Sequence, residues 1–116
     1  MTASLSSNTS QAGSHDDVYL TGLDDGWARV ENPRLGLRVT LTFDATLFRW
    51  LISWQPYGGA QAMPLAGSYA LGVEPWVTRL PLGPAAERGE ALELLPGAEL
   101  RTSLTLTVEQ VAPWQQ

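Results

Sequence analysis

The sequence contains 116 residues with a hydrophobic fraction of 44% and five tryptophans, a composition typical of one packed domain rather than a disordered chain. The formal net charge is −5, so a nucleic-acid backbone is an unfavourable partner. The lack of cysteine excludes disulfides and thiolate metal sites. No stretch approaches the roughly 20 apolar residues that span a bilayer. The start also lacks the features of a secretory signal. We therefore expect a cytoplasmic protein with no nucleic-acid or membrane partner.

The N-terminal part predicts a leader followed by short strands. Residues 1–15 are almost entirely polar or small, which predicts a disordered leader ahead of one β-domain over residues 16–112. The first two expected strands are Val18–Leu20 and Trp27–Glu31. The segment Gly22–Gly26 between them ends in Asp-Gly, which favours a turn with positive φ.

The next two segments predict a hairpin with a buried face. Leu37–Asp44 alternates apolar and polar side chains, as a half-buried strand does. Leu47–Gln55 is expected to pair with it through a tight connection that Asp44 caps. Trp50 and Trp54 alternate with an isoleucine, so we expect them in the core, and Trp27 with them.

Two irregular segments flank one short buried strand. Pro56–Ser68 is rich in Gly and Pro, and loops of that length in compact domains are often functional. Tyr69–Glu74 is the expected strand, with Tyr69, Leu71 and Val73 toward the core. Val77–Gly89 is expected to be irregular.

The C-terminal part predicts two further strands and fixes the fold class. Ala91–Leu95 is the first, the pair Pro96-Gly97 is a type II turn candidate, and Glu99–Glu109 alternates well enough for a long last strand. No 3.6-residue apolar period persists in the sequence. About seven short strands separated by turns predict an all-β, antiparallel β-sandwich.

The inventory of reactive side chains excludes most chemistries. The carboxylate pairs Asp16-Asp17 and Asp24-Asp25 lack the spacing of a calcium loop and are better explained as solvated turn residues. His15 is the single histidine and falls in the polar leader, so we assign it no role in a nucleophile–His–acid arrangement. We expect no metal and no cofactor.

Glu74 is the strongest candidate for a functional group. Pro75 holds Glu74 extended and ends the strand just beyond it. Strand parity places Glu74 on one face with the small residues Ala70 and Gly72, which leaves a shallow trough beside the carboxylate. Trp76 returns to that face if the chain stays extended, and an indole beside a carboxylate suits a sugar ring.

Two loop residues complete the candidate substrate site. Tyr57 and Arg79 lie in or beside loops, where a sugar hydroxyl or a phosphate can reach them. The alternative is that Glu74 only ends a strand and bonds Arg79 or a backbone N–H. The residues alone leave both interpretations open.

A family resemblance rests on the order of several motifs. These are the strand Gly36–Asp44, the aromatic strand Leu47–Trp54, the run Tyr69–Trp76 with its Glu-Pro-Trp end, and Leu94–Leu100 with its Leu-Pro-Gly, followed by an alternating strand. Over residues 17–110 the chain resembles the C-terminal portion of the aldose 1-epimerase, or galactose mutarotase-like, family. The resemblance implies part of a large β-sandwich.

The resemblance also implies a reaction. At the position matching Glu74, that family has a glutamate that takes the proton from the anomeric hydroxyl. A histidine protonates the ring oxygen, and the ring opens and recloses in either configuration. The family's acid histidines belong to an N-terminal half that this sequence does not contain. The acid role is therefore not transferred to His15.

Three functions follow as alternatives. The chain is an aldose 1-epimerase-like isomerase with Glu74 as general base, a non-catalytic carbohydrate-binding β-sandwich, or an inactive fragment. A sandwich without its other half leaves strand edges unpaired and an apolar face uncovered. We therefore expect a homodimer, or a partner that supplies the N-terminal half, besides a small-molecule carbohydrate.

Overall fold

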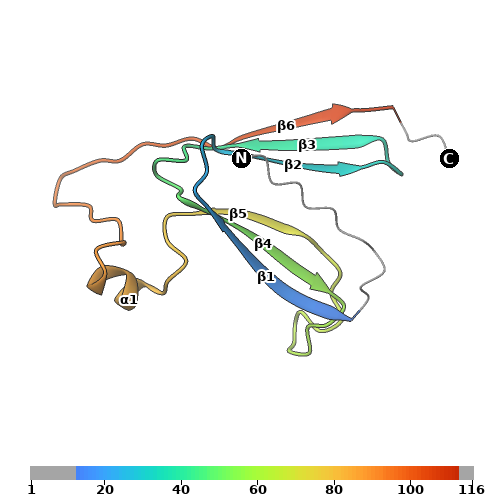
Figure 1. The fold of residues 1–116 in the computed structure, drawn as a ribbon, viewed down its shortest axis with the longest axis horizontal. Helices are drawn as coiled ribbons and strands as arrows, with labels where there is room; N and C mark the ends of the chain where they lie inside the picture. The colour runs from blue at the N-terminus through green and yellow to red at the C-terminus, as the bar shows by residue number, and fades with distance from the viewer. Residues whose placement is uncertain (1–12, 113–116) are drawn as a thin grey trace.

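The computed structural model describes residues 13–112, and its fold is all-β, as predicted. Six strands form two antiparallel three-stranded sheets, the arrangement expected of a β-sandwich (Figure 1). One sheet has the order β1-β4-β5, with β1 at Ser14–Thr21, β4 at Trp50–Tyr57 and β5 at Gly72–Trp76. The other has the order β2-β3-β6, with β2 at Trp27–Asn32, β3 at Leu37–Thr42 and β6 at Thr105–Gln110.

The start of the first strand differs from the prediction. Residues 1–12 of the predicted leader lie outside the described residues, whereas Ser14 and His15 belong to β1. Ser14 pairs with Tyr57, and the register continues without a break to Thr21 opposite Trp50. Because β4 supplies a full-length partner, polar residues that would not form a strand alone are drawn into the ladder.

The predicted hairpin between Leu37–Asp44 and Leu47–Gln55 is wrong. The strand β3 pairs with β2 and β6, and β4 pairs with β1 and β5, so the two segments belong to different sheets. Asp44 does cap the turn between them, as predicted: its Oδ1 accepts bonds from the Thr46 N–H (2.9 Å) and hydroxyl (2.6 Å). The Phe48 N–H then bonds the Asp44 carbonyl (2.8 Å), and this turn carries the chain out of the sheet.

The segment between β5 and β6 also differs from the prediction. A short helix, α1 at Leu82–Glu87, lies within the stretch expected to be irregular, and Ala91–Leu95 forms no strand. Regular pairing of the last strand is restricted to Thr105–Gln110, because β3 ends at Thr42 opposite Thr105. The Pro96-Gly97 turn is confirmed by the bond from Ala98 N–H to Leu95 C=O (2.9 Å) and by the positive φ of Gly97 (78°).

The core is small and centred on β4. Its buried side chains are Leu51, Ile52, Ser53, Pro56 and Tyr57, joined by a few residues from neighbouring segments. The predicted core position of Trp27 is wrong, since that residue is 39% exposed, and Tyr69 and Leu71 are also exposed. Trp50 and Trp54 are half-buried.

The molecule is elongated. Its radius of gyration is 16.8 Å, against about 13 Å for a compact chain of 100 residues. In the described part, extensive contacts between strands occur only between neighbours in one sheet.

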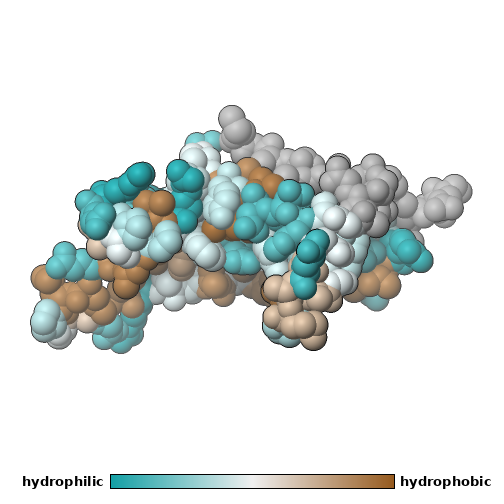
Figure 2. All heavy atoms as spheres, turned by 90° about the horizontal axis from the view of Figure 1, so that it is seen from below, coloured by the Kyte–Doolittle hydropathy of each residue, from teal (hydrophilic) through white to brown (hydrophobic). Residues whose placement is uncertain are grey.

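Figure 2 shows hydrophobic residues at the left end of the molecule, where Figure 1 places the segment around α1. That segment exposes Leu82, Leu92, Leu94 and Leu95. No helix among residues 13–112 is long and apolar enough to cross a membrane.

Candidate functional site

An open groove of about 350 Å³ lies on one face of the β1-β4-β5 sheet. Its lining consists of two acids, three aromatic residues and one isoleucine: Asp17, Glu74, Tyr19, Trp54, Trp76 and Ile52. Tyr19, Ile52 and Glu74 are directly opposite one another across the three strands, so their side chains share a face. Ile52 is 4% exposed and forms the floor. The groove therefore follows from the sheet register.

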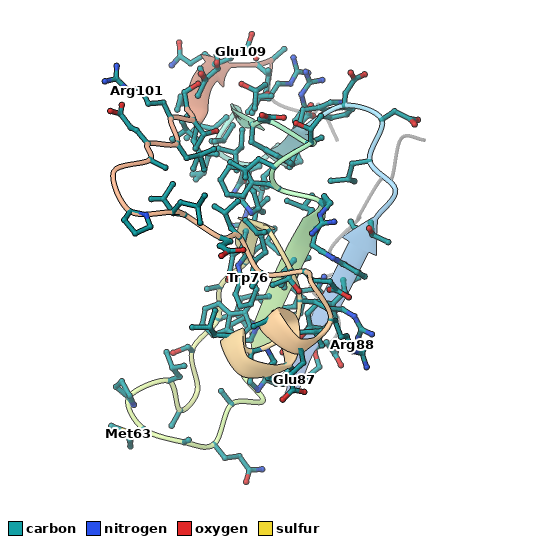
Figure 3. The ribbon with its side chains drawn as sticks, turned by 90° about the vertical axis from the view of Figure 1, so that its left-hand side faces the viewer. Met63, Trp76, Glu87, Arg88, Arg101 and Glu109 are labelled. Atoms are coloured by element: carbon teal, nitrogen blue, oxygen red, sulfur yellow. The ribbon has the colours of Figure 1, made fainter. Side chains whose placement is uncertain are left out.

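Glu74 and Trp76 lie together in the groove, because β5 continues through Pro75 to Trp76 instead of ending beside Glu74. Both residues belong to β5 and are two positions apart, which places them on the same face. The Trp76 Nε1–H donates to Glu74 Oε2 at 3.1 Å. This bond orients the carboxylate and holds the indole, which is 42% exposed, beside it. Figure 3 shows Trp76 in the middle of the molecule, between α1 and the β2-β3-β6 sheet.

Gly72 provides the space that Glu74 occupies. A Cβ at position 72 would lie 2.8 Å from Glu74 Oε1 and 3.1 Å from Trp54 Cβ. The absent side chain therefore lets the carboxylate fold back along β5 toward Trp54. Part of the predicted trough is thus filled by the carboxylate itself. Ala70 precedes the strand and is exposed, so it contributes little to the trough.

His15 lies on the groove face of β1, next to Trp54. The Trp54 Nε1–H donates to His15 Nε2 at 3.0 Å, and the two rings meet edge to face with centroids 6.3 Å apart. Because Nε2 accepts this bond, a neutral His15 carries its proton on Nδ1. The bond fixes the orientation of the Trp54 indole, which forms one wall of the groove. Its position in a strand corrects the assignment of His15 to the leader.

Asp17 and Tyr19 also line the groove, although the sequence pattern did not indicate a site there. They come from the edge strand β1 and face Glu74 across the central strand β4. The Cα atoms of Asp17 and Glu74 are two strands and two positions apart, which is about 12 Å in a regular sheet. Residues 15–20 read His-Asp-Asp-Val-Tyr-Leu, which has no apolar–polar alternation to mark the face that His15, Asp17 and Tyr19 share. The pairing that brings it beside Glu74 is long-range and had no local signal.

The structure does not bring Tyr57 into the groove. Its strand parity places it on the opposite face of β4 from Ile52 and Trp54. The residue is 5% exposed and stacks on Tyr69 with centroids 5.1 Å apart. Its hydroxyl is buried and has no hydrogen-bond partner among residues 13–112. Tyr57 is therefore a core residue and does not contact a ligand bound beside Glu74.

Arg79 lies at one end of the groove face. Its guanidinium stacks over the Trp50 ring, 5.5 Å from the ring centroid, and Trp50 is the cross-strand partner of Trp76. The Glu74 carboxylate bonds Trp76, so the alternative that Glu74 pairs with Arg79 receives no support. Arg79 is exposed and can reach a group that extends beyond the groove.

The donor set does not suit a metal ion. Among residues 13–112, no three His, Cys, Asp or Glu side chains are grouped so that they could hold one. The groove instead offers carboxylate oxygens, a phenol and indole faces. Comparison with known proteins finds no matching family model, no similar curated protein and no similar solved structure.

Proposed function

We propose that the chain binds the ring of a carbohydrate in the groove between Asp17 and Glu74. The observation that carries this proposal is the bond between Trp76 and Glu74, which presents an indole and an oriented carboxylate to the same groove. A pyranose has apolar C–H faces that pack on indole rings and hydroxyl groups that donate to carboxylates. The groove has both kinds of group on walls formed by different strands.

Anomeric interconversion is the second candidate function, with Glu74 as general base. The favouring observation is that a second wall bearing Asp17 and Tyr19 faces Glu74, since the reaction needs proton-exchanging groups on two sides of the anomeric centre. Glu74 would take the proton of the anomeric hydroxyl while a group opposite protonates the ring oxygen. The resemblance to the aldose 1-epimerase family points to the same reaction.

Binding is tested by titrating the protein with glucose and galactose while following tryptophan fluorescence. Trp54 and Trp76 line the groove, so a bound ring changes their emission. We expect Glu74→Gln to weaken binding about tenfold or more, because a charged acceptor is lost. Glu87→Gln, at the exposed end of α1, is the matched control and should leave binding unchanged. Equal affinities for wild type and Glu74→Gln would overturn the proposal.

Turnover is tested separately by polarimetry on freshly dissolved α-galactose and α-glucose. If Glu74 acts as the base, wild type accelerates mutarotation above buffer and Glu74→Gln loses that acceleration by a factor of about 100 or more. A wild type that binds sugar and shows no acceleration would reject the isomerase candidate. That result would leave carbohydrate binding as the function.

A further inference from the structure

The outer edge of β6 is the least protected of the strand edges in the part of the chain that the structure describes. Among the described residues, β6 pairs only with β3, and all six of its residues are exposed. Figure 1 shows β6 at the border of its sheet, on the side away from β1, β4 and β5. An exposed edge strand presents a row of unpaired N–H and C=O groups that another strand can bond.

The edge strands β1, β2 and β5 contain residues that discourage pairing with another strand. The edge strand β5 contains Pro75, which has no N–H to donate. The edge strand β1 carries the adjacent acids Asp16 and Asp17, and β2 carries charges at Arg29 and Glu31. Residues 102–108 have no charge and no proline, and the single charge of β6, Glu109, lies next to its end. This contrast singles out the β6 edge as the one open to another strand.

The segment before β6 lacks a partner for its own strand pattern. Alternation of apolar and polar residues predicts a strand from Glu99 to Glu109, but β3 ends at Thr42, opposite Thr105. Residues 101–104 therefore continue beyond the sheet without a ladder. A strand added on the outer edge of β6 would pair with them and complete the predicted strand.

We propose that β6 pairs antiparallel with β6 of a second copy of this chain, across a two-fold axis at Thr105. In this register each residue opposes the one equally far from position 105 in the partner. The pairing is isologous, as in most homodimers, and joins two three-stranded sheets into one of six strands.

Charge complementarity selects the second copy and the register. The only antiparallel register that places Arg101 opposite the partner's Glu109 is the one centred on Thr105, and symmetry forms this pair twice. Arg101 is 87% exposed at its side chain and holds Glu99 of its own chain, with further N–H groups to donate. Arg38, the β3 neighbour of Glu109, pairs with Glu31 at 2.7 Å. Figure 3 shows Arg101 and Glu109 on the β6 side of the molecule.

The apolar face agrees with the same register. Leu104 would oppose the partner's Leu106, and both side chains are more than half exposed in the single chain. Leu106 and Val108 already share a face with Leu41 and Val39 of β3. Cross-strand aliphatic pairs are a main source of sheet stability, so the dimer extends an existing apolar surface across the axis.

A disulfide at the axis tests the register, because the natural chain contains no cysteine. In Thr105→Cys the two cysteines face each other with Cα atoms about 5 Å apart, which suits a disulfide. In Thr107→Cys, on the same strand and face, the two copies lie about 14 Å apart. We expect mild oxidation to give at least tenfold more covalent dimer with Thr105→Cys. Equal cross-linking of the two variants, or none with Thr105→Cys, would overturn the proposal.

Light scattering on the unmodified chain tests the assembly itself. We expect a concentration-dependent dimer that Arg101→Glu weakens about tenfold or more, because it places two glutamates opposite each other at both ends of the strand pair. Arg88→Glu, at the end of α1, makes the same charge change away from β6 and should leave the dimer unchanged. A monomer at all concentrations, or equal weakening by the two variants, would overturn the proposal. Neither assay uses sugar, so its outcome is independent of the groove.

Discussion

At the scale of single residues, the sheet face that a side chain occupies decides whether it lines the groove or packs in the core. Tyr57 and Trp76 both looked like aromatic ligand residues beside loops. Strand pairing places Trp76 in the groove and Tyr57 on the opposite face of β4, stacked on Tyr69. The difference is one of parity within a strand, and parity is fixed only when the strand's partners are known.

The buried Tyr57 hydroxyl supplies a direct test of that assignment. A buried polar group without a partner costs about 1–3 kcal/mol, so Tyr57→Phe should raise the free energy of unfolding by about 1 kcal/mol. Chemical denaturation measures this change. Sugar affinity should be unchanged, because the hydroxyl is remote from the groove. Loss of affinity without a gain in stability would show instead that Tyr57 contacts the ligand.

Asp44 makes stability depend on pH in an acid range. The bonds from the Thr46 hydroxyl and N–H hold the pKa of Asp44 below its ordinary value of 3.8. The folded state therefore favours the charged form, which adds stability above pH 3.8 that is lost as pH falls through the folded pKa.

We accordingly expect Asp44→Asn to lower the melting temperature at neutral pH and to have a smaller effect below the folded pKa. Thermal melts of both proteins across this pH range measure the difference. Asp25→Asn is a control carboxylate in a neighbouring turn. A deficit for Asp44→Asn that does not shrink in acid would mean that the charged form of Asp44 has no special stability.

At the scale of elements, local patterns predicted the strands better than their partners. The bounds of β2 and β3 were located closely, by the turns on either side of β2 and by the alternation along β3. The same alternation could not tell that β4 pairs with β1 and β5, since pairing depends on segments distant in sequence. Helix α1 was not predicted, because six residues are too few to establish a 3.6-residue period.

The candidate site likewise divides into residues that local spacing associates and residues that only long-range pairing brings together. Glu74, Trp76 and the space at Gly72 are neighbours along β5, so residue spacing was enough to associate them. Asp17, Tyr19 and His15 lie on β1. Only the pairing of β1 with the distant strand β4 brings them to the groove face and allows the bond between His15 and Trp54.

The turn before β2 depends on the absence of a side chain at Gly26. The sequence suggested a positive φ there, but the positive φ in this turn belongs to Gly22. A Cβ at Gly26 would lie 1.9 Å from the carbonyl oxygen of Phe43, whose N–H bonds the Gly26 carbonyl at 2.8 Å. The glycine therefore allows close approach of two backbones.

Gly26→Ala should destabilise the fold by about 2 kcal/mol or more, because a backbone atom must move. The melting temperature of the transition that unfolds the β2-β3-β6 sheet should fall by about 10 °C. Gly83→Ala is the matched control, since a Cβ there meets nothing within 4 Å. Thermal melts of the two variants compare them directly, and similar melting temperatures would contradict the predicted clash.

At the scale of the whole molecule, the sheets are two units with few shared contacts. The described strands contact extensively only within a sheet, and the radius of gyration of 16.8 Å exceeds that of a compact chain of this length. The buried residues concentrate on β4, in one of the two sheets. Cooperative unfolding requires contacts that couple all parts of a chain, so this architecture favours separate unfolding of the two sheets.

Ile52→Ala tests this independence, because Ile52 is buried in the centre of the β1-β4-β5 sheet. Removal of its side chain should cost about 3 kcal/mol in that sheet. We expect native-state hydrogen exchange to speed up for amides of β1, β4 and β5 while those of β3 keep their protection. Leu41→Ala, in the centre of the other sheet, should show the reverse pattern. A uniform loss of protection across both sheets would show that they unfold as one unit.

Independent sheets also make a prediction about function, because the proposed groove lies wholly on the β1-β4-β5 sheet and the β6 edge lies wholly on the other. Leu41→Ala should therefore weaken dimerisation and leave sugar binding unchanged.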